Sequence, residues 1–162
     1  YHAVWQALLA SWKPLKEVLI LFDYHADNLM WLPEHKGIKQ VGLLDFQDAL
    51  LGDASYDLVS LLEDARRTVS ESLQQAMIAR YLAQMTDVKE ADFRAAYAMM
   101  GAQRNLRIIG TFARLAVRDK KPHYLHFLPR VWGHLERDIE HPILAPLKKH
   151  LDKTVPNEMR TL

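Results

Sequence analysis

The sequence predicts an α+β fold that is mainly helical, with its strands confined to the first third of the chain. Two observations support this prediction. Short apolar runs separated by a turn fill residues 18–44, which is the pattern of a β-hairpin. From Tyr56 onward, apolar residues instead recur at helical spacing. A small β unit followed by a run of helices is typical of the α+β class.

The first segments alternate between helix and strand. Residues 4–9 have the apolar spacing of an amphipathic helix, which Lys13-Pro14 ends. Residues 18–21 are a short apolar run, typical of a buried strand. Residues 28–32 and 40–44 are two further predicted strands, and a Pro- and Gly-containing turn joins them into a hairpin. No strand is expected after this hairpin.

Helices are expected over the rest of the chain, and capping residues predict where they begin. Ser55 is the expected N-cap of the first. Thr68-Val69-Ser70-Glu71 has the form of a capping box for the second, and Asp87 is expected to cap a long third helix. Pro129 and Pro142 suit the first position of the last two helices. Gly101 and Gly110 are expected to bend the long helix or permit close packing.

Bulk composition bounds the function. The 162 residues fit one domain or one large lobe, and a formal net charge of +1 gives no sign of a nucleic-acid or membrane partner. The absence of cysteine excludes disulfides and thiolate metal sites. We expect a cytoplasmic protein, since no signal peptide or membrane-spanning run is visible. The chain opens at Tyr1 inside a helical pattern, which we interpret as a piece of a longer protein.

Three oxygen-bearing side chains flank the predicted hairpin. Asp23 and Asn28 lie at the start of its first strand and Asp45 follows its second, so we expect them at one end of the hairpin. An Asp followed five positions later by an Asn is the spacing of a kinase catalytic loop, and an Asp after the next strand is the second metal ligand there. Carboxylate and amide oxygens suit Mg²⁺. The pattern therefore predicts phosphoryl transfer.

These motifs resemble the aminoglycoside/choline phosphotransferase family, whose members have a protein-kinase-like fold. Within it, the likeness is greatest to bacterial kinases of cell-wall amino sugars, which phosphorylate N-acetylmuramate or N-acetylglucosamine at the anomeric hydroxyl. The resemblance rests on residues 23–29, 44–49, Gly52 with 56–58, and the distal segments 103–105, 112–115 and 128–132.

The resemblance implies that residues 1–162 form the C-terminal lobe of such a kinase. The catalytic loop and metal site then lie in residues 18–48 and a helical subdomain in 55–153. The N-terminal nucleotide-binding lobe has no counterpart in this sequence. The implied cofactors are ATP and Mg²⁺, and the implied substrate is a small molecule, an amino sugar or an aminoglycoside. We expect this piece alone to be inactive and to expose an apolar face, which favours self-association.

The same resemblance assigns roles to individual residues. Asp23 is the catalytic base, and Asn28 and Asp45 are the ligands of the nucleotide-bound Mg²⁺. Asp57 is the acid near the start of the next helix that braces the catalytic loop by hydrogen bonds. His25 is expected to support the loop structurally, with its ring hydrogen-bonded to the backbone.

Two residues depart from the family pattern and motivate an alternative. The family usually has His two residues before the base and Gly or Arg one before, whereas this chain has Leu21 and Phe22. A catalytically inactive binding or scaffold module is therefore one alternative. The local density of His and Asp motivates a second alternative, a metal-dependent hydrolase that uses Asp23, His25, Asp27 and Asp45.

Simpler interpretations stay open for several side chains. Asp23 and Asn28 also suit turns, and Asp57 suits the first turn of any helix. Asp27 and Asp48 either join the site or are solvated acids.

The long helix carries a basic stripe, Arg104, Arg107, Arg114 and Arg118. The stripe is expected to be solvated, with binding of the lactyl carboxylate of muramate as the alternative. Three aromatic residues are expected in the core, with sugar stacking as the alternative: Trp31, Tyr124 and Trp132.

Overall fold

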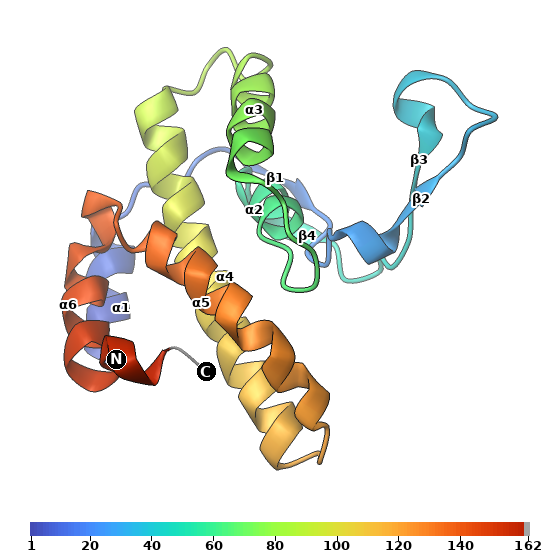
Figure 1. Cartoon of the computed structure of the whole chain (residues 1–162). Coiled ribbons are helices and arrows are strands. Elements are labelled where there is room, and N and C mark those ends of the chain that lie inside the picture. The colour runs from blue at the N-terminus through green and yellow to red at the C-terminus, as the bar shows by residue number, and fades with distance from the viewer. Residues whose placement is uncertain (161–162) are drawn as a thin grey trace.

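A computed structural model describes residues 1–160, which are mainly helical with two small antiparallel sheets (Figure 1). The helices are α1 His2–Ser11, α2 Tyr56–Leu62, α3 Glu71–Leu82, α4 Glu90–Val117, α5 Leu128–Asp138 and α6 Ala145–Thr154. The strands are β1 Glu17–Ile20, β2 Leu29–Trp31, β3 Val41–Leu43 and β4 Leu50–Asp53. Short 3-10 turns are η1 Ala26–Asn28, η2 Gly37–Gln40, η3 Pro122–Phe127, η4 Pro142–Leu144 and η5 Asn157–Met159. The predicted mainly helical α+β class is confirmed.

The predicted hairpin is present as β2 and β3. Leu29 pairs with Leu43 and Trp31 with Val41 in antiparallel register, and the hairpin projects away from the helices (Figure 1). Because it projects, its apolar side chains are not covered: Trp31 is 64% exposed. The expectation that Trp31 belongs to the core is therefore wrong. Trp132, by contrast, is buried in the core as expected.

One strand was not expected. β4 follows the hairpin and pairs antiparallel with β1, with Ile20 opposite Leu50 and Val18 opposite Gly52. The prediction that strands end with the hairpin is wrong because the β4 sequence Leu-Leu-Gly-Asp lacks β-branched residues and is defined by its distant partner. Gly52 is needed there, since a Cβ at this position would lie 2.5 Å from Cδ1 of Ile20.

The predicted helix starts are correct to within a few residues, but several caps are wrong. α3 is capped by Ser70, whose Oγ accepts from the Leu73 amide (3.3 Å), and not by Thr68. α4 has Lys89 at its N-cap in place of Asp87. Ser55 occupies the N-cap of α2 without capping it, because its hydroxyl donates to Asp53 Oδ1 (2.7 Å).

α4 is the central element of the helical part. The larger hydrophobic core lies between α4, α5, α6 and α1. It includes Met99, Val131, Leu135 and Leu147, which are all fully buried. A smaller core joins α2, α3 and α4 through Leu62, Ile78 and Phe93. The two cores place α2 against one side of α4, and α2 begins directly after β4.

The two helical glycines have different surroundings. A Cβ on Gly101 would lie 2.6 Å from both carboxylate oxygens of Asp138 on α5, so this glycine permits a close approach of the two helices. A Cβ on Gly110 would meet nothing within 4 Å. Of the two expected roles, close packing therefore holds for Gly101.

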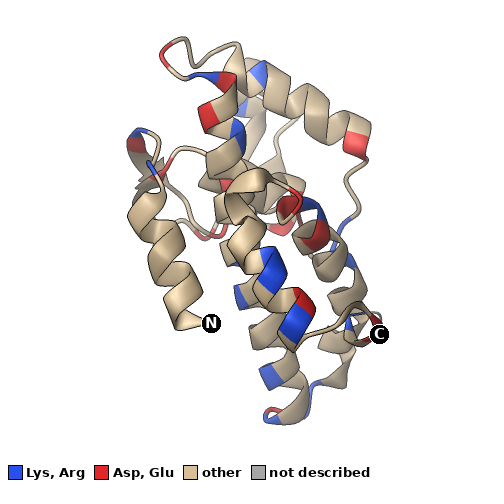
Figure 2. Cartoon of the chain, turned by 90° about the vertical axis from the view of Figure 1, so that its left-hand side faces the viewer, with Lys and Arg blue, Asp and Glu red and all other residues tan. Residues whose placement is uncertain are grey.

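Charge is unevenly spread over the helices. α1 carries no Lys, Arg, Asp or Glu, whereas the neighbouring α6 carries Lys148, Lys149 and Lys153 (Figure 2).

No helix within residues 1–160 is both long enough and apolar enough to cross a membrane.

Candidate active site

The segment between β1 and β2 folds into a tight loop that carries Asp23. Asp57, in the first turn of α2, accepts hydrogen bonds from the main-chain amides of Leu21 (2.7 Å) and Phe22 (3.1 Å). Burial raises the pKa of the Asp57 carboxyl, and the two amides oppose that rise because they stabilise the ionised form. The loop is thereby attached to the start of α2.

Further hydrogen bonds close the loop around Asp23. The Asp23 carbonyl accepts from the amide of His25 (3.1 Å) and from Nδ2 of Asn28 (2.9 Å). The main-chain amide of Asn28 in turn donates to the His25 carbonyl (2.9 Å). Asp23 is exposed, so its carboxylate is open to solvent.

Asp45 follows β3 at the same end of the hairpin. The amide of Leu44 donates to the carbonyl of Asn28 (2.9 Å), one step beyond the Leu29–Leu43 pair. Asp45 itself has a left-handed backbone with φ of 56°, which turns the chain sharply away from the strand. Asn28 and Asp45 therefore leave the hairpin from neighbouring main-chain positions.

The chemistry of these two side chains suits Mg²⁺. Asn28 uses Nδ2 for the Asp23 carbonyl, which leaves its carboxamide oxygen for a cation. Gln47 donates to Oδ1 of Asp45, which leaves Oδ2. One or two protein oxygens, completed by phosphate oxygens and water, are the usual magnesium arrangement in phosphoryl-transfer enzymes.

The residues required by the hydrolase alternative do not gather. In the described part of the chain, no three His, Asp or Glu side chains form a group that could hold an ion. Asp27 is instead paired with Arg67, whose Nη2 lies 2.7 Å from Oδ1 of Asp27 and lowers the pKa of that carboxyl. This arrangement disfavours a metal-dependent hydrolase.

The expected support of the loop by His25 does not come from its ring Nδ1, which is buried and has no hydrogen-bond partner among residues 1–160. Its contacts with the loop are made by its main chain, through Asp23 and Asn28. Residue type alone does not show whether a histidine supports a loop through its ring or through its main chain.

Phe22, which departs from the family pattern, has a defined place in the loop. Its backbone is left-handed, with φ of 71°. Its ring stacks on Tyr56, with centroids 5.4 Å apart and an interplanar angle of 1°. The guanidinium carbon of Arg107 lies 4.6 Å from the Phe22 ring centroid, and Arg107 Nη2 donates to the Tyr56 hydroxyl (3.0 Å). The bulky ring therefore packs the loop against α2 and α4.

Sequence reasoning assigned no role to Tyr56, although it lies inside the family motif next to Asp57. Tyr56 is only 5% exposed, and its burial raises the pKa of its phenol. An aromatic residue directly before the bracing acid is a sequence signal that could have indicated a stacking partner for the unusual Phe22.

The basic stripe on α4 is not uniformly solvated. Arg104 is buried, and its Nη1 donates to the carbonyl of Glu63 (3.1 Å), so the expectation of a solvated side chain is wrong there. Arg130 of α5 likewise donates to the carbonyl of Ala65 (2.9 Å). These two arginines hold the segment after α2, which carries Arg67 to the loop that contains Asp23 and Asp27.

A sequence model described as the phosphotransferase enzyme family matches residues 1–98. The match covers more than half of the chain and includes the whole loop and hairpin together with Asp57. The chain belongs to this phosphotransferase family.

Curated relatives of this phosphotransferase chain are named N-acetylmuramate/N-acetylglucosamine kinases. The chain is 45% identical over 160 residues to that of Caulobacter vibrioides, covering 99% of this chain and 44% of the relative. It is 36% identical over 157 residues to that of Pseudomonas aeruginosa, covering 86% and 45%. It is 42% identical over 149 residues to that of Neisseria meningitidis, covering 88% and 43%. The chain thus spans less than half the length of these relatives.

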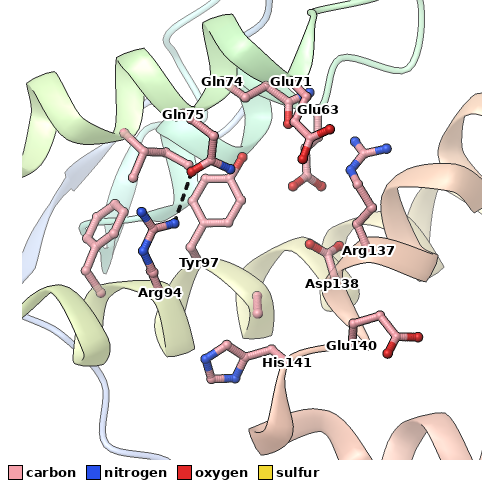
Figure 3. Close-up of a pocket in the computed structure, with 13 residues that line it drawn as sticks. Glu63, Glu71, Gln74, Gln75, Arg94, Tyr97, Arg137, Asp138, Glu140 and His141 are labelled. Atoms are coloured by element: carbon pink, nitrogen blue, oxygen red, sulfur yellow. Dashed lines mark hydrogen bonds between the residues drawn. The ribbon is translucent and has the colours of Figure 1, made fainter.

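The phosphotransferase chain also contains a buried polar cluster away from the loop. A cavity of about 400 Å³ lies between α3, α4 and the end of α5, and Glu63 and Asp138 face one another on its inner side (Figure 3). Nδ2 of Asn105 donates to both carboxyls, at 2.7 Å and 2.9 Å. Burial raises the pKa of both acids, and the charge of Glu63 raises that of Asp138 further.

Proposed function

We propose that the protein is an ATP-dependent kinase that phosphorylates the anomeric hydroxyl of N-acetylmuramate or N-acetylglucosamine. The observation that carries the proposal is the loop geometry: Asp23 is open to solvent, while Asn28 and Asp45 leave one end of the hairpin with free oxygens. The names of the relatives support the choice of acceptor.

Each residue has a separate task in this reaction. The Asp23 carboxylate accepts the proton of the sugar hydroxyl as that oxygen bonds to the γ-phosphorus and the bond to the leaving ADP oxygen breaks. Asn28 and Asp45 would hold Mg²⁺, which would neutralise charge on the phosphates. Asp57 and Tyr56 keep the loop in place through Leu21 and Phe22.

We also propose that the exposed apolar residues of the two sheets pack against the remaining part of the full-length enzyme, which would supply the nucleotide-binding lobe. Leu19 and Leu51 are each 66% exposed on the β1–β4 sheet, and Trp31 is 64% exposed on the hairpin. Apolar groups this exposed on neighbouring strands favour a covering partner. In the isolated 162-residue chain, the same surface favours self-association, which light scattering measures.

The test is steady-state kinetics of the full-length protein with ATP, Mg²⁺ and each of the two sugars. Asp23→Asn is expected to lower kcat by roughly a hundred- to ten-thousandfold, the usual contribution of a general base. Asp27→Asn is the matched control. It removes a carboxylate from the same loop, and that carboxylate is paired with Arg67. We expect it to lower kcat less than about tenfold, since an exposed ion pair contributes up to about 1 kcal/mol.

Equal kcat in wild type and Asp23→Asn would show that Asp23 is not the base. Absence of phosphorylation of either sugar by the wild-type enzyme would contradict the assigned acceptor. If the protein is instead an inactive scaffold, the wild-type protein phosphorylates neither these sugars nor any other acceptor.

A further inference from the structure

The guanidinium of Arg107 is the cationic group that packs directly on the residue before the proposed base. We propose that Arg107 binds the carboxylate of an anionic acceptor and thereby selects N-acetylmuramate, which carries a lactyl carboxylate, over N-acetylglucosamine, which has none. This inference rests on the proposed function and names the acceptor that the site prefers.

The guanidinium is held in place by two contacts. Its carbon lies 4.6 Å from the centroid of the Phe22 ring, and Nη2 donates to the hydroxyl of Tyr56 (3.0 Å). Tyr56 is itself buried and stacked on Phe22. An arginine has five N–H donors, so the bond to Tyr56 leaves most of them for another partner. A guanidinium that is already oriented loses little further freedom when it binds a carboxylate.

Arg107 forms no ion pair with a carboxylate of residues 1–160. Within residues 1–160, other arginines form ion pairs with carboxylates, among them Arg67 with Asp27 and Arg118 with Asp119. No carboxylate lies within 4 Å of Arg107 in that same part of the chain, and its side chain is exposed. The nearby Asp57 is already occupied by the amides of Leu21 and Phe22. An anion supplied by a ligand therefore meets an unpaired guanidinium.

Arg107 and the proposed base, Asp23, lie in the same small region of the protein. Phe22, on which Arg107 packs, is the residue before Asp23. Arg107 also donates to the hydroxyl of Tyr56, whose ring stacks on Phe22, so its guanidinium lies beside the loop that carries Asp23. A sugar whose anomeric hydroxyl meets Asp23 can present a substituent of the same ring to Arg107. A carboxylate and a guanidinium are also a matched pair in geometry and charge.

The test compares kcat/KM for the two sugars in the full-length enzyme. Arg107→Gln is expected to lower the ratio of kcat/KM for N-acetylmuramate to that for N-acetylglucosamine by roughly ten- to a hundredfold, the usual effect of losing one hydrogen bond to a charged group. Arg107→Lys keeps the charge without the planar fork and is expected to lower the ratio less. Arg114→Gln, two turns further along α4 and also exposed, is expected to leave the ratio unchanged.

The ratio separates substrate selection from a purely structural role. If Arg107 only packs the loop, or contacts the phosphate, Arg107→Gln lowers kcat/KM for both sugars equally and the inference is overturned. That outcome leaves the proposed function intact, since wild-type enzyme still phosphorylates both sugars. A wild-type enzyme that phosphorylates neither sugar removes the proposed function and this inference together.

Discussion

The Asp57 carboxylate accepts a 2.7 Å hydrogen bond from the main-chain amide of Leu21, a residue 36 positions earlier in the chain. A second bond, from Phe22 at 3.1 Å, fixes the direction in which the next residue, Asp23, leaves the loop. Because Tyr56 stacks on Phe22, the first two residues of α2 contact the loop through both its main chain and its ring. The position of α2 therefore determines where the proposed base lies.

Asp57→Asn is expected to lower kcat by roughly tenfold to a hundredfold, because small displacements of a catalytic group carry costs of that size. The asparagine keeps the size of the side chain but has one oxygen where two amides need acceptors. Steady-state kinetics of the full-length enzyme measures the effect. Asp87→Asn, in the loop before α4, is the control and should have wild-type kcat. An unaltered kcat in Asp57→Asn would mean that the loop keeps its position without this carboxylate.

Asp45→Asn is expected to raise the Mg²⁺ concentration needed for half-maximal activity by roughly tenfold or more, since it removes a charged oxygen from the proposed metal site. Asp48→Asn changes a carboxylate three residues further on and should leave the Mg²⁺ dependence unaltered. Activity measured over a Mg²⁺ titration at fixed ATP distinguishes the two variants. Superimposable titration curves for wild type and Asp45→Asn would remove Asp45 from the proposed metal site.

Elements with strong local signals were predictable from the sequence, whereas those defined by distant partners were not. The hairpin follows from two apolar runs and a turn, and the start of α5 follows from Pro129, which lies in its first turn. β4 is not predicted because it pairs with residues of β1 that lie 30 to 36 positions earlier, and Leu-Leu-Gly-Asp has no strand signal of its own.

The features of the candidate site also divide into those that a local pattern predicts and those that depend on a distant partner. The spacing of Asp23, Asn28 and Asp45 is a local pattern and locates the loop and hairpin that carry them. The packing of Arg107 on Phe22 links residues 85 positions apart, and no periodicity in either segment predicts it. Arg104 and Arg107 also have the same place in a helical stripe, yet one is buried against Glu63 and the other is exposed.

Gly101→Ala and Gly110→Ala are expected to change stability in opposite directions. At Gly101 the new methyl group would lie 2.6 Å from the Asp138 carboxylate, and overpacking of this kind costs about 1–3 kcal/mol. At Gly110 nothing lies within 4 Å, so alanine should stabilise the exposed helix by about 0.5–1 kcal/mol. Urea unfolding followed by circular dichroism measures both free energies of unfolding. A stabilising Gly101→Ala would mean that α5 can move away from α4 at little cost.

The buried pair of Glu63 and Asp138 makes stability depend on pH. Their ordinary pKa values are 4.5 and 3.8, and burial raises both in the folded protein. The groups that face them include Tyr97, Asn105, Arg104 and Arg137. The hydrogen bonds from Asn105 and the charge of Arg137 oppose the rise for both acids, and the charge of Arg104 opposes it for Glu63. The folded chain therefore holds protons that the unfolded chain releases above about pH 4.5. Stability from this source is fully present below the unfolded values and is lost as pH rises through the folded ones.

Asp138→Asn should flatten this dependence, because the neutral amide has no proton to lose and still offers an oxygen to Nδ2 of Asn105. Each proton bound only in the folded state contributes up to about 1.4 kcal/mol per pH unit to the slope of the free energy of unfolding. Urea unfolding at a series of pH values above 4.5 measures that slope. Asp92→Asn, an exposed acid in the first turn of α4, should keep the wild-type slope. An unchanged slope in Asp138→Asn would mean that Glu63 alone holds the proton, which Glu63→Gln then tests by the same measurement.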